Sequence, residues 1–231
     1  MKNIQNESGR SMVEILGVLA IIGVLSVGGI AGYNAAMDRI YANRLLERFN
    51  MIYEASMTAY HMPNSYMSCC SYDSISDKGV YLYSGCRDGV DFRSQQLDEV
   101  SALLPSDYCP KRFVYKDNLL SEPYCADEER DDIQGRGGWA VRMLNSAARG
   151  NFVITFWRLP SRYSTKSCEL ALQSIIHTPA YAPHIVKLGR VLNNDWLAFD
   201  PTDENVKNIC AVDMGFSVAF DHIKGDDCNQ E

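Results

Sequence analysis

The chain has 231 residues and a formal net charge of −7 at pH 7, with 46% hydrophobic and 22% charged residues. This length allows one sizeable domain or two small ones, and the acidic balance gives no indication of nucleic-acid binding. Eight cysteines lie outside the most apolar stretch, and none forms a CxxC pair. An even number of scattered cysteines behind an N-terminal apolar segment predicts disulfide bonds in an oxidising compartment.

The first element is a long apolar stretch that follows a short polar leader. Residues 15–37 contain no charged side chain, and as a helix they would span about 34 Å, enough for the hydrocarbon core of a bilayer. No small-residue cleavage site of a secretory signal follows the stretch, so we expect it to be retained. Glu14 stands at its leading edge, where a carboxylate either reaches the lipid headgroups or requires a partner of opposite charge. Cleavage between Gly9 and Arg10 would create a free amine four residues before Glu14, about one helical turn away.

The order Gly9-Arg10-Ser11-Met12-Val13-Glu14, followed by a long apolar helix, resembles the signature of the type IV pilin and pseudopilin family. The resemblance implies that residues 1–9 are a leader, and that prepilin peptidase cuts after Gly9 on the cytoplasmic side of the membrane. It also implies that Glu14 neutralises the N-terminal amine of a neighbouring subunit during assembly. The family usually has Phe or Met where Arg10 stands, which leaves N-methylation of Arg10 open.

The apolar segment departs from the family pattern at one position. Many members have a proline where this chain has Ala31, and this chain has a cluster of glycines instead. Each glycine weakens a helix interior by about 0.8–1 kcal/mol relative to alanine, so the cluster favours local unwinding or close helix packing. Frequent glycine is equally typical of membrane helices in general, and the sequence leaves both interpretations open. The glycines are Gly23, Gly28, Gly29 and Gly32.

The helix is expected to continue past the apolar segment, over residues 10–62 in all. Apolar side chains recur there at spacings of four, four, four and three, which is one stripe of an α-helix, and Pro63 should end it. We therefore predict an α+β fold, in which one long N-terminal helix, half in lipid and half amphipathic, packs on a C-terminal antiparallel β-sheet head. The stripe consists of Met37, Tyr41, Leu45, Phe49 and Ile52.

Residues 63–138 show weak periodicity and correspond to the variable αβ-loop region that the resemblance implies. The run GVYLYSG indicates an isolated strand, and SQQLDEVSALLP indicates a short helix ending at Pro105. A region with so little pattern requires covalent links, and five cysteines fall within it. Their pairing is left open by the sequence: Cys69, Cys70, Cys86, Cys109 and Cys125.

Residues 139–231 are predicted to form the β-sheet head. WAVRMLN and NFVITFWRL are strand-like runs joined by SAARG, and TKSCELALQSII indicates a helix with Thr165 or Ser167 near its N-cap. DMGFSVAFDHI indicates a late strand in which three apolar residues alternate. Between that helix and that strand the sequence shows little regular periodicity and contains three prolines. The alternating residues are Phe216, Val218 and Phe220, and the prolines are Pro179, Pro183 and Pro201.

This order of elements resembles the C-terminal sheet of type IVb-like pilins, in which a disulfide closes the D-region. The resemblance pairs Cys168 with Cys210. Cys228 is the rival partner of Cys168, because it also lies at the C-terminal edge of the sheet. Type IVb leaders are usually longer than the segment 1–9 of this chain.

The sequence contains no HExxH, GxSxG, P-loop or GxGxxG pattern. The acidic runs Ala126–Asp132 and Asp200–Glu204 lack EF-hand spacing, which favours solvated loops over calcium sites. Three tryptophans favour core positions over a sugar-binding surface. We therefore expect no enzyme activity, no metal and no cofactor. The tryptophans are Trp139, Trp157 and Trp196, and the dispersed histidines are His61, His177, His184 and His222.

Taken together, the resemblance implies a structural subunit, major or minor, of a type IV pilus-like surface filament. The expected partners are identical or related subunits, prepilin peptidase, the inner-membrane assembly machinery and, before assembly, the lipid bilayer. The expected location is the bacterial inner membrane, as a single-pass protein, and then the periplasm and the cell-surface filament. Two alternatives stay open: a pseudopilin of a type II secretion system, and a membrane-anchored periplasmic binding or catalytic domain, which would need neither Gly9 nor Glu14.

Overall fold

The computed structural model describes residues 8–63, 65, 67, 71–75, 81–83, 92–116, 121–126, 138–145, 152–157, 159, 162–192, 195–211 and 215–221. Several sequence predictions fall outside this set. They concern residues 1–7, the acidic run from residue 127 onward, the turn at residues 146–150, His222, and the cysteines Cys69, Cys70, Cys86 and Cys228.

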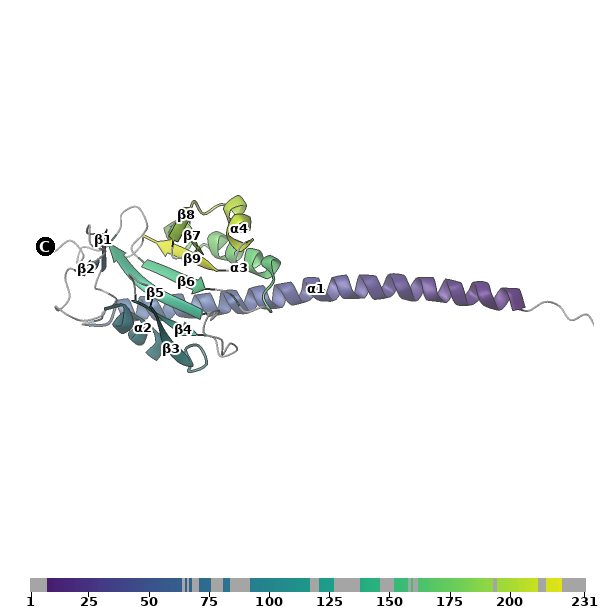
Figure 1. Cartoon of the computed structure of the whole chain (residues 1–231), viewed down its shortest axis with the longest axis horizontal. Helices are drawn as coiled ribbons and strands as arrows, with labels where there is room; N and C mark the ends of the chain where they lie inside the picture. The colour runs from purple at the N-terminus through teal and green to yellow at the C-terminus, as the bar shows by residue number, and fades with distance from the viewer. Residues whose placement is uncertain are drawn as a thin grey trace, which may run out of the picture.

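The chain has an α+β structure, in which one very long helix carries a head of strands and shorter helices at its C-terminal half (Figure 1). In chain order the elements are α1 (Ser8–Tyr60), β1 (Ser71–Ile75), β2 (Tyr81–Tyr83), α2 (Phe92–Ala102), β3 (Lys111–Lys116), β4 (Ser121–Ala126), β5 (Gly138–Asn145), β6 (Phe152–Trp157), α3 (Thr165–His177), the 3₁₀ helix η2 (Ala182–His184), β7 (Ile185–Leu192), β8 (Asp195–Phe199), α4 (Asp203–Cys210) and β9 (Phe216–Phe220).

Helix α1 is a single element of 53 residues with two different environments. Its first half projects away from the head, and residues 12–36 are exposed on every side (Figure 1). Its second half packs into the head, where Leu45, Phe49 and Ile52 are fully buried, as the stripe predicts. The helix ends at Tyr60, three residues before Pro63, so the predicted extent of 10–62 is correct to within two residues at each end.

The described strands form one branched sheet with the order β2-β1-β5-β6-β9-β7-β8, and β4 joins β5 while β3 joins β4. Its strand pairs are antiparallel, as predicted, with one exception. Strand β1 runs parallel to β5, where Ser71 lies opposite Leu144 and Tyr72 opposite Asn145. The region 63–138 therefore contributes strands to the sheet, so it is more regular than its weak periodicity indicates.

Strand β9 lies in the middle of the sheet, between β6 and β7, and Val218 is opposite both Ile154 and Leu188. All five of its residues are buried. The predicted alternation is correct, because Phe216, Val218 and Phe220 belong to the core that packs on α1. The opposite face is buried as well: the hydroxyls of Ser217 and Thr155 form a hydrogen bond of 2.9 Å there.

Aromatic rings join α1 to the sheet. The ring centre of Tyr53 lies 5.3 Å from that of Phe220 and 5.4 Å from that of Tyr181, while Phe49 lies 5.6 Å from Tyr181. Such ring pairs favour tilted contacts like these over face-to-face stacking. The phenol of Tyr181 also donates a hydrogen bond of 2.9 Å to Oδ1 of Asn50. The second half of α1 is thus a core element of the head.

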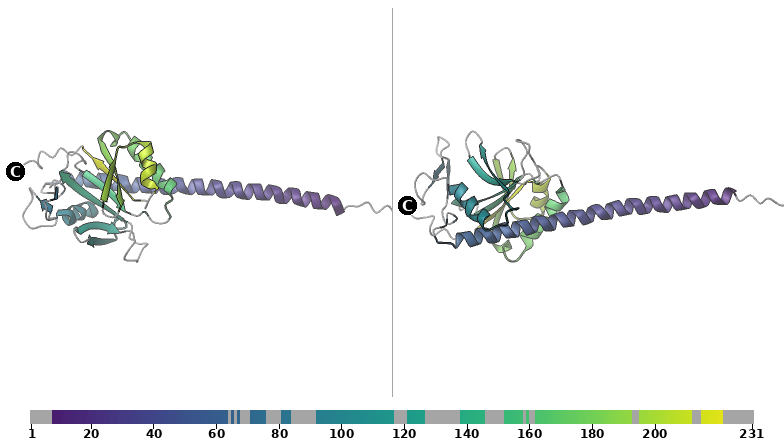
Figure 2. Two further views of the ribbon diagram at one scale, coloured as in Figure 1. Left: turned by 45° about the horizontal axis from the view of Figure 1, so that its top comes forward. Right: turned by 90° about the horizontal axis from the view of Figure 1, so that it is seen from below.

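Helix α3 packs against α1 (Figure 2). It buries one apolar face at helical spacing: Cys168, Ala171, Leu172, Ile175 and Ile176. The sequence predicts that Thr165 or Ser167 lies near its N-cap, and Thr165 is the first residue of the helix. The N-cap is Ser164, whose extended backbone leaves its hydroxyl free to accept the backbone N–H of Ser167 at 3.0 Å.

The segment between α3 and β9 is regular, which corrects the expectation of an irregular region. It holds η2, the β7–β8 hairpin and α4, and β7 is an inner strand of the sheet. Its prolines border these elements. Pro183 occupies the start of η2, where the missing backbone N–H has no helical partner to lose, and Pro201 precedes Thr202, the N-cap of α4.

Candidate membrane and assembly site

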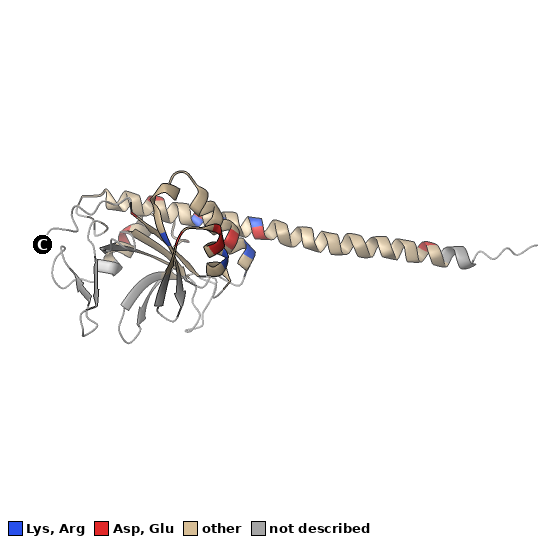
Figure 3. Cartoon of the chain, turned by 90° about the horizontal axis from the view of Figure 1, so that it is seen from above, with Lys and Arg blue, Asp and Glu red and all other residues tan. Residues whose placement is uncertain are grey.

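The most prominent candidate site is the exposed half of α1. Within the described chain, α1 is the one helix long and apolar enough to cross a membrane. Large apolar side chains cover its surface and are 52–73% exposed from Met12 to Tyr33. Figure 3 shows this stretch without Lys, Arg, Asp or Glu between Glu14 and the beginning of the head. An apolar surface of this length is unfavourable in water, so it requires lipid or protein around it.

Glu14 lies near the far end of this stretch, in the second turn of the described helix. Its side chain is exposed, and it has no hydrogen-bond or ion-pair partner among the described residues. The nearest acidic residue along α1 is Asp38, 24 positions later, or about 36 Å along the helix axis. A carboxylate at the end of an apolar helix requires a cation or water beside it. The side chains of the head are too distant to neutralise Glu14.

The proposed cleavage position falls inside the first turn of α1. Ser8 and Gly9 are helical, and the helix continues through Arg10 without a break. Loss of residues 1–9 would leave Arg10 as the first residue of α1, one turn before Glu14. The sequence-predicted set of Gly9, Arg10 and Glu14 is therefore confined to one short end of one helix. The side chain of Arg10 lies outside the described part of the chain.

The glycines of the exposed segment have no role in packing within this chain. A Cβ atom added at Gly17, Gly23, Gly28, Gly29 or Gly32 would meet no atom within 4 Å. The helix nevertheless passes through all five positions unbroken. Their cost in helix stability is therefore not offset by any close contact with the head.

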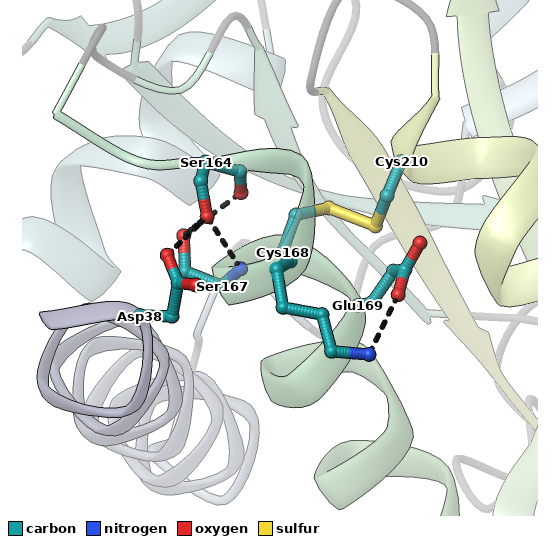
Figure 4. A network of polar contacts seen from close by, with 7 residues as sticks. Asp38, Ser164, Ser167, Cys168, Glu169 and Cys210 are labelled. Atoms are coloured by element: carbon teal, nitrogen blue, oxygen red, sulfur yellow. Dashed lines mark hydrogen bonds and ion pairs between the residues drawn. A yellow bond between two sulfur atoms is a disulfide. The ribbon is translucent and has the colours of Figure 1, made fainter. Parts of the chain in front are cut away.

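The other end of the apolar segment is fixed to the head by a polar network (Figure 4). Asp38 is the first charged residue of α1 after the apolar stretch, and its Oδ1 accepts a 2.6 Å hydrogen bond from the hydroxyl of Ser164. The same hydroxyl accepts the N–H of Ser167, whose own hydroxyl donates to the carbonyl of Ser164 at 2.8 Å. One serine thus caps α3 and joins it to α1. The carboxylate also lies at the N-terminal, positive end of the α3 dipole.

One turn into α3, Cys168 is bonded to Cys210 at the end of α4, with Cα atoms 5.8 Å apart (Figure 4). This is the pair that the type IVb resemblance implies. Both cysteines are fully buried. Beside them, on the surface, Lys166 forms an ion pair of 3.1 Å with Glu169. The bond holds α4 against α3, which the Ser164–Asp38 hydrogen bond joins to α1.

A second disulfide, which the sequence left unassigned, joins Cys109 to Cys125. The carbonyl of Tyr108, next to it, accepts a 2.7 Å hydrogen bond from the indole N–H of Trp139 and a 3.3 Å bond from Arg48 of α1. Trp139 is fully buried, which confirms the core role predicted for it. Among the described cysteines, none is free.

No metal or catalytic arrangement is found among the described residues. They contain no group of three or more His, Cys, Asp or Glu side chains placed to hold a metal ion. Two carboxylates of the acidic run Asp200–Glu204 have partners. Asp200 accepts a hydrogen bond from the ammonium group of Lys187, and Oδ1 of Asp203 lies 3.1 Å from Nε2 of His177. His184 lies 3.6 Å from Asp221. His177 and His184 therefore each have a carboxylate neighbour on the surface of the head.

The tyrosines with shifted pKa values belong to the core around α1. Burial raises the pKa of Tyr53 above its usual 10.0, and the charge of Glu54 raises it further. Burial also raises the pKa of Tyr181, and a hydrogen bond with Thr178 lowers it in part. These shifts favour the neutral phenols that the aromatic contacts require.

Comparison of the chain with protein-family models, curated proteins and solved structures found no match.

Proposed function

We propose that this chain is a type IV pilin-like structural subunit, held in the inner membrane by α1 and then assembled with identical or related subunits into a surface filament. In this proposal residues 1–9 are removed by prepilin peptidase, and the apolar segment exchanges lipid for the helices of neighbouring subunits. The subunit has no catalytic role.

The observation that carries the proposal is the arrangement of α1. One continuous helix is a core element of the head over its second half, and is fully exposed, apolar and uncharged over its first half. A simple membrane anchor needs only the apolar segment. It has no use for a carboxylate in the second turn that lacks a partner among the described residues. Glu14 is supplied with a counter-charge if the new amine at Arg10 of an adjacent subunit lies beside it.

The experiment is incorporation of Glu14→Ala into filaments, in competition with tagged wild-type subunit in the same cells. We expect membrane insertion to be unchanged and incorporation to fall several-fold, because the filament would lose the ion pair and keep an unpaired amine in an apolar surrounding. Ser26→Ala is the matched control. Ser26 is an exposed polar side chain of the same apolar segment, and its hydroxyl already donates to the carbonyl of Ile22 at 2.7 Å.

Equal incorporation of Glu14→Ala and wild type would refute the assembly role of Glu14. Immunoelectron microscopy with an antibody to the head distinguishes a pilin from the alternative functions. Labelled filaments on the cell surface support a pilin, whereas a processed protein that never appears outside the cell supports the pseudopilin alternative. A protein that keeps residues 1–9 supports the membrane-anchored domain.

A further inference from the structure

A second feature of the head lies where α1 leaves the apolar segment. Arg44 of α1 places its guanidinium carbon 5.7 Å from the ring centre of Tyr41, the Tyr41 ring lies 5.5 Å from that of Tyr163, and Arg162 places its guanidinium carbon 5.4 Å from the Tyr163 ring. Cations and aromatic rings at these distances attract one another. We call these four residues, together with Arg39, the basic collar.

The basic collar lies directly beside the segment that would span the bilayer. Arg39 is two residues beyond Met37, the last residue of the uncharged stretch, and Figure 3 shows charges reappearing on α1 at this level. Along the helix axis Arg39 is about 3 Å and Arg44 about 10 Å from Met37. The headgroup layer of each leaflet is roughly 5–8 Å thick, so both residues lie at or next to it.

The direction of the side chains also favours the bilayer. Side chains of an α-helix tilt toward its N-terminus, which for α1 is the membrane end. The observed contact agrees, because Arg44 reaches back to Tyr41, which is one turn nearer to the apolar segment. Long basic side chains at such a boundary place their apolar parts against the acyl chains and their charged ends among the headgroups.

Asp38, the acidic residue next to Arg39, does not neutralise the exposed cations Arg39 and Arg44. Glu47 lies one turn beyond Arg44, on the side away from the apolar segment. Asp38 turns to the head, where it accepts from Ser164. Arg39 and Arg44 are exposed, and neither has a carboxylate partner within the described part of the chain. The chain as a whole is acidic, with a net charge of −7, so the basic side chains at this boundary are not a general property of its surface.

We infer that the basic collar binds the phosphate groups of anionic phospholipids on the membrane face that the head contacts. The inference rests on the membrane location in the proposed function. A second copy of this chain is the rival occupant, since Asp203 and Glu204 at the start of α4 are exposed and acidic. Lipid is favoured because the exposed cations Arg39 and Arg44 follow directly on the apolar segment. The rings of Tyr41 and Tyr163 belong to the core of the head and hold Arg44 and Arg162 in place.

The test uses the full chain in a neutral detergent, titrated with phosphatidylglycerol or phosphatidylcholine that carry the same fluorescent tail. We expect tighter binding of phosphatidylglycerol by about fivefold for each engaged cation. Arg39→Gln/Arg44→Gln should lose most of this preference, and Arg39→Lys/Arg44→Lys should keep most of it. Lys207→Gln removes an exposed charge from α4, outside the collar, and should change nothing.

Wild-type protein provides a measurement that does not depend on any variant. The preference for phosphatidylglycerol should disappear at about 1 M salt, where the screening length falls to about 3 Å. Equal affinity for the two lipids at low salt would overturn the inference. So would an unchanged preference in Arg39→Gln/Arg44→Gln, or crosslinking of the collar to α4 of a second copy without any lipid preference.

These outcomes are independent of the tests of the proposed function. A chain that keeps residues 1–9 and still prefers phosphatidylglycerol would contradict the filament assignment and leave the lipid site standing. A chain that is processed and enters filaments, but binds both lipids equally, would support the filament assignment and contradict the lipid site.

Discussion

The hydroxyl of Ser164 donates a hydrogen bond to Oδ1 of Asp38, a residue 126 positions earlier in the chain, at 2.6 Å. The hydroxyl oxygen of Ser164 also accepts the backbone N–H of Ser167. The contact fixes α3 to the point where α1 leaves its apolar segment. The head is therefore oriented on the helix by a bond at the edge nearest the apolar segment as well as by its apolar core.

We expect Ser164→Ala to lower the free energy of unfolding of the head by about 1–2 kcal/mol, because it removes both the N-cap of α3 and the bond to Asp38. Urea unfolding of the full chain in detergent, followed by the fluorescence of buried Trp139, measures this change. Ser164→Thr keeps a hydroxyl at the N-cap and should lose much less stability. If Ser164→Ala unfolds at the same urea concentration as wild type, the network in Figure 4 contributes nothing to stability.

The Cys168–Cys210 bond closes a loop with a sequence separation of 42, and loop entropy assigns it about 4 kcal/mol. We expect its loss to free α4 first. Helix α4 has only eight residues, whereas β7 is paired on both sides with β8 and β9. In a Cys168→Ser/Cys210→Ser variant, hydrogen exchange at α4 amides should therefore rise far more than exchange at β7 amides.

The second disulfide provides the matched control. Cys109→Ser/Cys125→Ser should increase exchange in β3 and β4, which that bond borders, and leave α4 protected. Equal loss of protection in β7 and α4 after removal of Cys168–Cys210 would show that the whole loop depends on the bond. Peptide mapping that joins Cys168 to any other cysteine would contradict the pairing itself.

The raised pKa of Tyr181 predicts a loss of stability at high pH. Burial holds the folded-state pKa above the unfolded value of 10.0, so the neutral phenol stabilises the folded head below pH 10. That contribution declines as the pH rises above 10, since the unfolded chain then releases its proton more readily. Ionisation also removes the proton that Tyr181 donates to Asn50.

We therefore expect the melting temperature to fall between pH 9 and pH 11, and to fall less steeply in Tyr181→Phe. The melting temperature of that variant should be lower than that of wild type at pH 8, where the phenol still donates. Thermal unfolding followed by near-ultraviolet circular dichroism at each pH makes the comparison. A Tyr181→Phe curve parallel to that of wild type would exclude Tyr181 as the group responsible.

Processing after Gly9 is testable by mass alone. Protein extracted from membranes of a host with the processing enzyme should lack residues 1–9. Gly9→Val should retain them, because a branched side chain beside the cut obstructs approach to the backbone. Gly17→Ala should be processed normally, since its added methyl group meets no atom of this chain within 4 Å. A full-length wild-type protein, or a cut after Ala31 or later, would refute the prepilin assignment.

Local patterns predicted much of the fold. The stripe from Met37 to Ile52 defined the buried half of α1, and the period-two run from Phe216 to Phe220 defined β9. The N-cap of α3 could be predicted only to within a few residues, because Ser164, Thr165 and Ser167 are all good capping residues within one turn. Only the backbone conformation decides among them.

Features that depend on packing between distant parts of the chain had no comparable pattern in the sequence. The hairpin of β7 and β8 was missed because Pro179, Pro183 and Pro201 suggested a broken segment, although Asn193-Asn194 between its two apolar runs is typical of a tight turn. Nothing in the sequence links Asp38 to Ser164 or Tyr41 to Tyr163, because these contacts exist only after α3 has packed on α1.

The central position of β9 determines the order in which the head is completed. The strands on either side of it, β6 and β7, come earlier in the chain and have open edges toward each other until Phe216–Phe220 arrives between them. A chain interrupted before Phe216 would hold two half-sheets with unpaired edges, which are templates for pairing with other chains. The sheet of the head can therefore close only once the chain through Phe220 is present.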